Sequence, residues 1–478
     1  MKKIGIFLFP IFALTFTGLA QPGQILRPDG KMISAAFVDR IVKKLMDTAD
    51  VAGLSLGIIN DNKAAYVHAY GYKDRAGKTL NDTATCFYAA SLSKALFAYL
   101  VMQLVDKGLL DLDKPLYAYL PKPLPEYDNY KDLAGDDRWK LITARHCLDH
   151  TTGFPNWREF NPRDNKKLEI FFTPGERYAY SGEGLYLLQL VVETITGKGL
   201  EALAREQIFG PFAMTRTSYV WQPSFETNYA MGHDLNMDPL PKRRRKTANA
   251  AGSMETTVAD YTRFVAAVMQ GKGISQRSER EILSPQIGIN SKQQFPSLST
   301  DTTNENKKIK LSYGLGWGLF TTPYGKAFFK EGHDDGWVHY TIGFPDKKIA
   351  LVVMCNSSSG ESIFKELVER LTGVTIPWEW EGYTPYRATV KLPEAVLQQF
   401  TGNYDGKQKA TISIVDGRLK VESSTAGLPK TNLYATNDHH FFLKVMATDL
   451  EFVKGADGKI EKIIVDDEGE HYALKKLP

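Results

Sequence analysis

The sequence has few cysteines and little net charge. Cys86, Cys147 and Cys355 are the three cysteines among 478 residues, and they lie far apart. Three distant thiols cannot all pair, which excludes a fold held together by a framework of disulfides. The 59 lysines and arginines nearly balance the 55 aspartates and glutamates, giving a net charge of +4. This balance argues against a nucleic-acid-binding protein, whose binding face concentrates positive charge.

Long hydrophobic runs are also missing, except at the N-terminus. Residues 4–20 carry no charge and follow Lys2 and Lys3, and small residues precede Gln21. This run is shorter than the about 20 residues that span a bilayer, and its pattern is typical of a cleaved secretory signal. We therefore predict a signal peptide over residues 1–20, an exported chain that is periplasmic or secreted, and no transmembrane anchor after cleavage. A lipoprotein is not expected, because Gln21 stands where the lipid-bearing cysteine would be.

The remaining sequence has ordinary globular composition, with a change of texture near the C-terminus. Hydrophobic residues make up 43% of the chain, and a length of 478 residues predicts two or three folding units. Residues 110–260 read as helical pieces between loops rich in proline and glycine, with strand patterns on both sides in sequence. Residues 21–380 are thus expected to form one domain, whose sheet is built from both ends around a helical insertion. Residues 390–478 predict a small all-β domain with a hairpin turn at Asp416-Gly417.

A basic run at residues 242–246 (KRRRK) is the densest positive charge in the chain. Aromatic residues do not interrupt it, and an exported protein rarely meets nucleic acid. Adjacent charges of this kind usually form a solvated loop. We therefore interpret the run as an exposed loop and expect no nucleic-acid partner.

The tetrapeptide Ser91-Leu92-Ser93-Lys94 is the most informative motif for chemistry. Serine and lysine at i and i+3 lie on one face of a helix, so Lys94 can reach the Ser91 hydroxyl. A serine hydroxyl becomes a good nucleophile when a neighbouring base takes its proton. A lysine can be that base if burial or another cation lowers its pKa, and apolar residues flank the tetrapeptide on both sides.

Further segments follow the tetrapeptide in a consistent order. They are residues 143–153 (TARHCLDHTTG), 174–182 (PGERYAYSG), 250–256 (AAGSMET), 313–317 (YGLGW) and 332–336 (GHDDG). Together these segments, over residues 35–375, resemble the serine hydrolases related to class C β-lactamases and penicillin-binding DD-peptidases. The resemblance implies an α/β (α+β) fold, with an antiparallel sheet flanked by helices and a helical subdomain. The C-terminal all-β domain also resembles domains often appended to these hydrolases.

The resemblance implies acyl transfer through a covalent acyl-enzyme. Ser91 would attack a carbonyl carbon, and Lys94 and Tyr180 would share the role of base, with the phenol's pKa pulled down by nearby cations. His333 would occupy the third-motif position, which holds lysine in many β-lactamases. The oxyanion hole would come from the backbone N–H groups of Ser91 and Gly336. No cofactor or metal is implied.

Two departures from the family pattern concern substrate binding. The tyrosine motif usually reads Tyr-x-Asn, but Gly182 stands at the third position, so the side-chain amide that would hold a substrate amide is absent. The third motif usually places glycine two residues after its lysine or histidine, but Asp335 stands there beside Asp334. If these carboxylates face the pocket, they oppose the carboxylate of a β-lactam. We therefore expect neutral esters, or amides with a free amine, to be better substrates than anionic β-lactams.

A zinc site and an α/β-hydrolase are the competing interpretations of the sequence. His146 and His150 share a helix face, but the metalloprotease pattern His-Glu-x-x-His is missing, so packing and capping explain them better than zinc. Gly53-Leu54-Ser55-Leu56-Gly57 matches the Gly-x-Ser-x-Gly pattern of the α/β-hydrolases, but it falls in an expected strand at residues 54–59 rather than at the strand-to-helix turn that this pattern requires. We predict an exported serine hydrolase that cleaves a small-molecule ester, amide or peptide. The alternative that stays open is a degenerate penicillin-binding-like sensor that binds or slowly acylates cell-wall fragments without turnover. The sequence does not indicate an oligomeric state.

Overall fold

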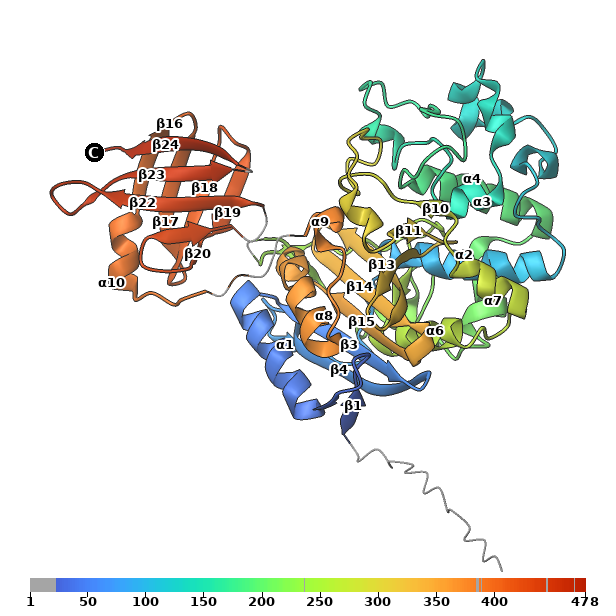
Figure 1. Ribbon diagram of the computed structural model, residues 1–478, viewed down its shortest axis with the longest axis horizontal. Coiled ribbons are helices and arrows are strands. Elements are labelled where there is room, and N and C mark those ends of the chain that lie inside the picture. The colour runs from blue at the N-terminus through green and yellow to red at the C-terminus, as the bar shows by residue number, and fades with distance from the viewer. Residues whose placement is uncertain (1–22, 236, 384–386, 388, 444–445, 468) are drawn as a thin grey trace, which may run out of the picture.

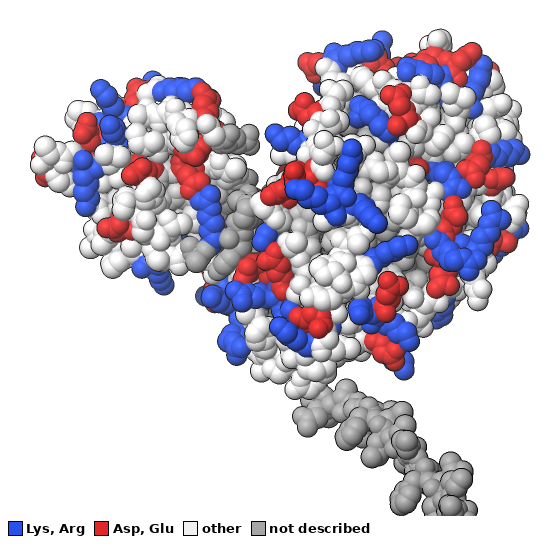
Figure 2. Space-filling view, viewed as in Figure 1, with Lys and Arg blue, Asp and Glu red and all other residues white. Residues whose placement is uncertain are grey.

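The computed structural model describes residues 23–478 except 236, 384–386, 388, 444–445 and 468. The expected signal peptide at residues 1–20 lies outside the described part. Figure 1 shows a large domain and, to one side of it, a smaller C-terminal sheet drawn in red. The described helices include none with the length and apolar character needed to traverse a lipid bilayer. Positive and negative side chains are interspersed over the face of the molecule seen in Figure 2.

The large domain is built on a nine-stranded antiparallel sheet whose strands come from both ends of the domain, as the sequence predicts. In spatial order its strands are β10 (Ile287–Gly288), β11 (Ser312–Tyr313), β12 (Gly318–Thr322), β13 (Gly325–Asp334), β14 (Trp337–Phe344), β15 (Ile349–Cys355), β3 (Gly53–Asn60), β4 (Lys63–Asp74) and β5 (Thr79–Leu80). The N-terminal hairpin β3–β4 joins the C-terminal strands where β15 pairs with β3. The central strands are buried on both faces, which explains the continuous apolar run in β15.

Helices cover both faces of this sheet (Figure 1). On one face lie α1 (Ala35–Ala49), which Ser34 caps as its sequence indicates, and α8 (Phe364–Thr372). On the other face lie α2 (Leu92–Asp106) and α6 (Val258–Met269). Side chains of β15 alternate between these two cores, because successive residues of a strand point to opposite faces.

The helical insertion, at residues 110–260, packs beside α2. Its α-helices are α3 (Ala144–Leu148), α4 (Gly182–Thr196) and α5 (Leu200–Ala204), with a π turn at Arg205–Phe209. Its 3-10 turns are Leu116–Tyr119, Leu124–Glu126, Asp128–Leu133, Asp137–Leu141, Arg158–Phe160 and Pro223–Phe225. Small strand pairs of the domain are β1 (Gln24–Leu26) with β2 (Met32–Ser34), β6 (Phe87–Tyr88) with β9 (Glu255–Thr256), and β7 (Gly232–His233) with β8 (Pro239–Leu240). The pair β6–β9 ties the segment before Ser91 to the segment after residue 250.

Short elements complete the large domain. They are α7 (Gln276–Ile282), α9 (Trp378–Glu381) and the 3-10 turns Glu305–Lys307, Pro345–Lys347 and Ser358–Ile363. Helix α9 and Tyr383 pack into the core formed by α1 and α8, so the packed domain extends slightly beyond residue 380. Several residues between Tyr383 and residue 390 lie outside the described part, and the domain limits 21–380 and 390–478 stay predictions.

The C-terminal region is a second nine-stranded antiparallel sheet with its own apolar core. In spatial order its strands are β19 (Leu428–Asn432), β18 (Arg418–Ser423), β17 (Lys409–Val415), β16 (Gly402–Gly406), β24 (Glu470–Lys476), β23 (Ile460–Asp467), β22 (Thr448–Lys454), β21 (His440–Phe442) and β20 (Tyr434–Ala435), preceded by α10 (Glu394–Leu397) and the 3-10 turn Gln398–Phe400. The two edge strands, β19 and β20, are consecutive in the chain, so the sheet curves toward a closed barrel. Asp416 and Gly417 both have positive φ angles, as a tight hairpin turn requires.

Candidate functional site

Ser91 immediately precedes α2 and lies at the helix N-terminus. The preceding residue, Ala90, has a φ of +45°, a left-handed conformation that is strained for a residue with a side chain. The first amide hydrogen bonds of the helix are donated by Leu92, Ser93 and Lys94 to the carbonyls of residues 89–91. Among the described residues, the Ser91 N–H has no such acceptor, so it is available to bind an oxygen atom of a ligand.

Lys94 is fully buried on the same side of the helix as Ser91. Its Nζ lies 2.8 Å from Ser91 Oγ and donates a 2.6 Å hydrogen bond to the carbonyl oxygen of Ala251. Burial lowers the pKa of Lys94 well below its ordinary value, and the nearby positive charge of Lys330 lowers this pKa further. These effects favour the neutral amine, which can accept the proton of the Ser91 hydroxyl.

Tyr180 is buried beside this pair and is held between two amines. Its ring centroid lies 5.0 Å from the Nζ atoms of both Lys94 and Lys330, and Lys330 Nζ lies 3.3 Å from the Tyr180 hydroxyl. Burial raises the pKa of Tyr180, although the charge of Lys330 and hydrogen bonds from Ser91 and Lys330 act in the opposite direction. Lys330 thus lowers this pKa as expected, but burial outweighs it, so the expected net decrease is wrong. A raised pKa favours the protonated phenol, which makes Lys94 the better candidate for the base.

The His150 ring packs against the Tyr180 ring. Its ring lies 4.3 Å from the Tyr180 ring, between centroids, and its Nδ1 accepts the Ser181 N–H at 3.1 Å. Burial, together with the charges of Lys330 and Lys94, lowers the pKa of His150 well below its ordinary value. A neutral imidazole in this position fixes the Tyr180 ring without adding another positive charge.

Lys330 is the functional residue that the sequence interpretation missed. It lies on β13, where it is completely buried and bonds Tyr180 and the Glu331 carboxylate, the latter at 2.9 Å. Two residues later, a Cβ added to Gly332 would lie 2.8 Å from the carbonyl oxygen of Ala89, so the strand approaches the start of α2 closely. Lys330-Glu331-Gly332 has glycine two residues after lysine, which is the spacing expected of the third motif. That spacing was the available signal.

The structure does not bring the His333 side chain or Gly336 to Ser91. The side chains of Lys330 and Gly332 point to the face of the sheet that carries α2, and alternation directs His333 to the opposite face. There its imidazole is 60% exposed and pairs with Glu361 at 3.0 Å. Gly336 lies in the turn between β13 and β14, and its N–H donates to Ser358 Oγ at 2.7 Å.

The backbone of His333 is placed differently from its side chain. Asp334 pairs with Trp337 next to the two-residue turn, and His333 pairs with Val338 one step further. Hydrogen-bonded pairs alternate with non-bonded pairs along an antiparallel ladder, so the His333 N–H points away from β14. Strand β12 does not cover this edge, because its pairing with β13 ends at Phe329. The His333 N–H is therefore directed to an open edge next to the start of α2.

Asp334 and Asp335 do not present to the pocket the two unpaired carboxylates that the sequence suggests. Asp334 lies 3.4 Å from Arg243 and 3.9 Å from Arg245, which neutralise it, and Asp335 is exposed in the hairpin turn. Both arginines belong to the basic run at residues 242–246. Each of residues 242–245 in this run lies within 4.0 Å of a carboxylate. The expected repulsion of anionic substrates thus loses its structural basis.

Gly182 starts α4, and the Trp157 indole fills the space beside it. A Cβ at position 182 would lie 2.2 Å from Trp157 Cζ3, which leaves no room for a side chain. The same indole lies 5.6 Å from Lys94 Nζ, measured from its ring centroid. An aromatic surface therefore stands where the family pattern places a side-chain amide.

The basic run is not a solvated loop throughout. The Lys242 side chain is 3% exposed and forms a 2.7 Å ion pair with Glu255, whose side chain is 2% exposed. The rings of Trp221, Tyr229 and Trp337 surround its Nζ within 5.8 Å. The run is therefore partly a structural element of the large domain.

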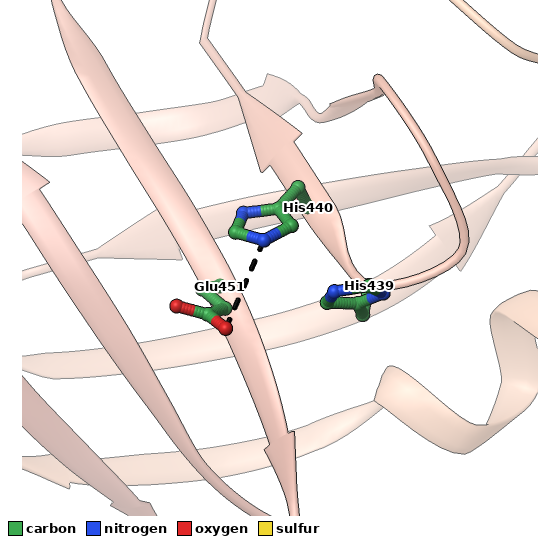
Figure 3. Close-up of side chains that lie close together, drawn as sticks. All are labelled: His439, His440 and Glu451. Carbon is green, nitrogen blue, oxygen red and sulfur yellow. Dashed lines mark ion pairs between the residues drawn. The ribbon is translucent and has the colours of Figure 1, made fainter.

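Among the described residues, the metal-compatible side chains do not gather into a group at this site. His146 helps to cap α3 and His150 contacts Tyr180, so the two histidines serve different neighbours. Within the described residues, one group has three metal-ligating atoms within 4.8 Å of one another: His439, His440 and Glu451. Figure 3 shows it at the β21–β22 hairpin of the C-terminal sheet, where His440 Nε2 lies 3.7 Å from Glu451 Oε1.

Known proteins match this chain over the large domain and beyond. A family model described as Beta-lactamase matches residues 38–372. A penicillin-binding protein of Bacillus subtilis (strain 168) is 24% identical over 452 residues, covering 86% of this chain and 92% of its own. A Beta-lactamase of Providencia stuartii is 24% identical over 350 residues, covering 67% of this chain and 86% of its own.

Solved structures share the fold at low sequence identity. The octameric penicillin-binding protein homologue from Pyrococcus abyssi has a TM-score of 0.59 at 20% identity, covering 93% of this chain and 100% of that one. D-alanine carboxypeptidase AmpC from Burkholderia cenocepacia has a TM-score of 0.54 at 21% identity, covering 67% of this chain and 93% of that one. Because the family model spans most of the chain, including Ser91, Lys94, Tyr180 and Lys330, this protein belongs to the β-lactamase family of serine hydrolases.

Proposed function

We propose that the protein is an exported serine hydrolase that cleaves an ester or amide through an acyl-enzyme on Ser91. The observation that carries the proposal is the 2.8 Å contact between Ser91 Oγ and the buried Lys94 Nζ. A depressed lysine pKa next to a helix-terminal serine supplies both a base and a nucleophile. Export rests on the signal-peptide pattern at residues 1–20 and implies a periplasmic or secreted enzyme.

Acylation begins when neutral Lys94 takes the proton of Ser91. The Ser91 oxygen attacks the carbonyl carbon, and the backbone N–H groups of Ser91 and His333 receive the developing oxyanion. As the tetrahedral intermediate collapses, the bond to the leaving group breaks. Lys94 returns the proton to the leaving group through the Tyr180 hydroxyl, which Lys330 holds in place.

Deacylation reverses these roles with water as the nucleophile. Water adds to the acyl carbon as its proton passes to the Lys94–Tyr180 pair, and the same N–H groups bind the oxyanion. The ester bond to Ser91 then breaks, and the serine oxygen recovers a proton from Lys94. The products are a free acid and an unmodified enzyme, so no cofactor or metal takes part in this proposal.

Turnover of three substrate classes tests the proposal and separates it from the sensor alternative. Purified mature protein is assayed with a nitrophenyl ester, a chromogenic cephalosporin and a D-amino-acid amide, beside Ser91→Ala. Hydrolysis of at least one class that is lost in Ser91→Ala supports an enzyme. Stoichiometric acylation of Ser91 without continued product release supports the degenerate penicillin-binding-like sensor instead.

A further inference from the structure

Arg245 stacks on Tyr88, which belongs to the segment just before Ser91. Its guanidinium carbon lies 3.7 Å from the ring centroid of Tyr88, three residues before Ser91. The Arg245 side chain is 21% exposed, so stacking fixes the planar group while solvent or a ligand can still reach it. Arg245 belongs to the basic run, but the catalytic proposal above gives it no role.

The Arg245 guanidinium lacks a close acceptor among the described residues. Its nearest carboxylates are Asp334 at 3.9 Å and Glu255 at 4.0 Å, both beyond hydrogen-bond distance. Each carboxylate has a nearer cation, since Glu255 pairs with Lys242 at 2.7 Å and Asp334 with Arg243 at 3.4 Å. A guanidinium has five N–H donors, and these donors remain available for a planar anion.

A cavity of about 980 Å³ opens beside this group. The residues that line it and matter here are Arg245, Tyr88, Trp157, Tyr186 and Gly252. Gly252 follows Ala251, whose carbonyl oxygen binds Lys94, so the cavity begins next to the nucleophile and its base. Asp334 and Glu255 do not line it, and the carboxylates that do, at Asp128, Glu159, Glu183 and Glu193, are not among the acids within 4.0 Å of Arg245.

The direction of the catalytic groups indicates which part of a substrate enters this cavity. The leaving group takes its proton from the Lys94–Tyr180 pair, so it lies on the side of Tyr180 and Lys330. The acyl portion is then left to extend along Tyr88 and Gly252. We propose that Arg245 binds a carboxylate on the acyl portion of the substrate, so that this hydrolase prefers acyl groups with a distal anionic end. The inference rests on the proposed function and names the substrate class of that site.

Matched ester pairs test this preference. The nitrophenyl monoesters of glutarate and adipate carry a distal carboxylate, and nitrophenyl valerate and hexanoate are their neutral counterparts. In the wild-type protein, kcat/KM is expected to favour the anionic member of at least one pair after correction for spontaneous hydrolysis. Arg245→Met keeps an unbranched apolar stem against Tyr88 and is expected to lower the anionic-to-neutral ratio by about tenfold or more.

Lys246→Met is the matched control, because it removes the same charge from the neighbouring exposed position and leaves Arg245 on Tyr88 and Arg243 beside Asp334. It is expected to leave the ratio unchanged. The proposal is overturned if Arg245→Met does not change the ratio, or if Lys246→Met lowers it equally, since a diffuse positive field would then explain the preference.

Direct binding separates failure of this inference from failure of the proposed function. If none of the three substrate classes is hydrolysed, the proposed function fails by itself, and calorimetric titration of Ser91→Ala with glutarate monoanilide still tests the subsite. Affinity that is about tenfold weaker in Ser91→Ala/Arg245→Met supports the carboxylate site. Equal affinity in the two variants overturns it.

Discussion

At the scale of single residues, the site depends on how three buried ionisable groups share charge. Lys94, Lys330 and Glu331 all lie in the core, and Glu331 pairs with Lys330 rather than with Lys94. Pairing raises the pKa of Lys330 and keeps it charged, whereas burial and that charge lower the pKa of Lys94. In the proposed mechanism, Lys330 is thereby the fixed cation and Lys94 the base.

Replacing Lys330 by methionine tests this division of roles. Lys330→Met removes the positive charge that lowers the pKa of Lys94 and leaves in place the Glu331 carboxylate, which raises it, so the pKa of Lys94 increases. Because the neutral amine is the active form, the acidic limb of the kcat/KM profile is expected to move to higher pH. A pH series with the neutral ester measures the shift. Lys326→Met, at an exposed position of the same strand, is the control and is expected to show no shift. An acidic or absent shift in Lys330→Met contradicts the account.

The sequence predicts the residues of the site that share one helix better than those that meet across the fold. Ser91 and Lys94 are three positions apart, so helix geometry alone brings them together. Lys330 was missed because His333 stands three residues later and also fits a third-motif position. Only the register of β13 shows that Lys330 and Gly332 face α2, whereas the His333 side chain faces away. Strand register depends on pairing between distant segments, which a single motif does not reveal.

At the scale of elements, the start of α4 and the loop that carries Trp157 are fitted to each other. Gly182→Ala places a methyl group where Trp157 Cζ3 lies, so the indole must move away from Lys94. We expect a loss of about 1–3 kcal/mol in unfolding free energy, measured by chemical denaturation, together with a changed kcat/KM. Gly288→Ala is the control, because a Cβ there meets nothing within 4 Å. If the clash with Trp157 is the cause, Gly182→Ala should cost little unfolding free energy in a chain that already carries Trp157→Ala. Full additivity of the two substitutions would argue against the steric explanation.

The basic run provides a second test at this scale. Lys242→Met leaves the buried Glu255 carboxylate without its closest cation, which is expected to cost about 3–5 kcal/mol of unfolding free energy. Lys246→Met, at an exposed position of the same run, is expected to change stability by no more than about 0.5 kcal/mol. Denaturant titrations of both variants measure the difference. Equal, small effects would show that the Lys242–Glu255 pair contributes little.

Elements with local signals were predicted more accurately than this run. The Asp416-Gly417 turn is specified by adjacent residues, and the structure has it. The run at residues 242–246 has no local signal that separates Lys242 from its neighbours. Lys242 is buried because it pairs with Glu255 and lies among the rings of Trp221, Tyr229 and Trp337, which are all outside the run.

At the scale of the whole molecule, the described chain forms two parts that share no apolar core, since two cores lie in the large domain and one in the C-terminal sheet. The C-terminal sheet has an apolar core of its own, and the catalytic groups all belong to the large domain. Arg418 of the C-terminal sheet forms a 2.6 Å ion pair with Asp50, which also binds Arg75 of the large domain at 2.9 Å. Partly exposed ion pairs of this kind contribute modestly to stability.

Separating the two parts tests their independence. A chain that ends at Tyr383 keeps α9 in the core and is expected to retain kcat/KM for a neutral ester within about threefold, since its catalytic groups are complete. Residues 390–478 alone are expected to unfold cooperatively. Circular dichroism and the ester assay measure both outcomes. A truncated chain that is folded but inactive would show that the C-terminal sheet contributes to the site.

The two-part architecture was predictable from sequence because a β pattern begins after residues 376–393, a segment that contains Pro377, Pro385 and Pro393. The position of α9 was less readable, because its aromatic residues occur in that same segment and only packing assigns them to the large domain. Composition therefore predicts an approximate boundary, and tertiary contacts assign α9 to the large domain.

The site of acylation is the most direct test of the central claim that Ser91 is the nucleophile and Lys94 its base. The protein is treated with a serine-directed acylating probe, and the adduct is located by tandem mass spectrometry. The peptide from Thr79 to Lys94 also contains Ser93, which is buried, so fragmentation must separate the two serines. The account predicts one adduct on Ser91 that disappears in Ser91→Ala and forms about 10²–10⁴-fold more slowly in Lys94→Met. An adduct on Ser93 or on any other residue, or unchanged labelling in Lys94→Met, would contradict it.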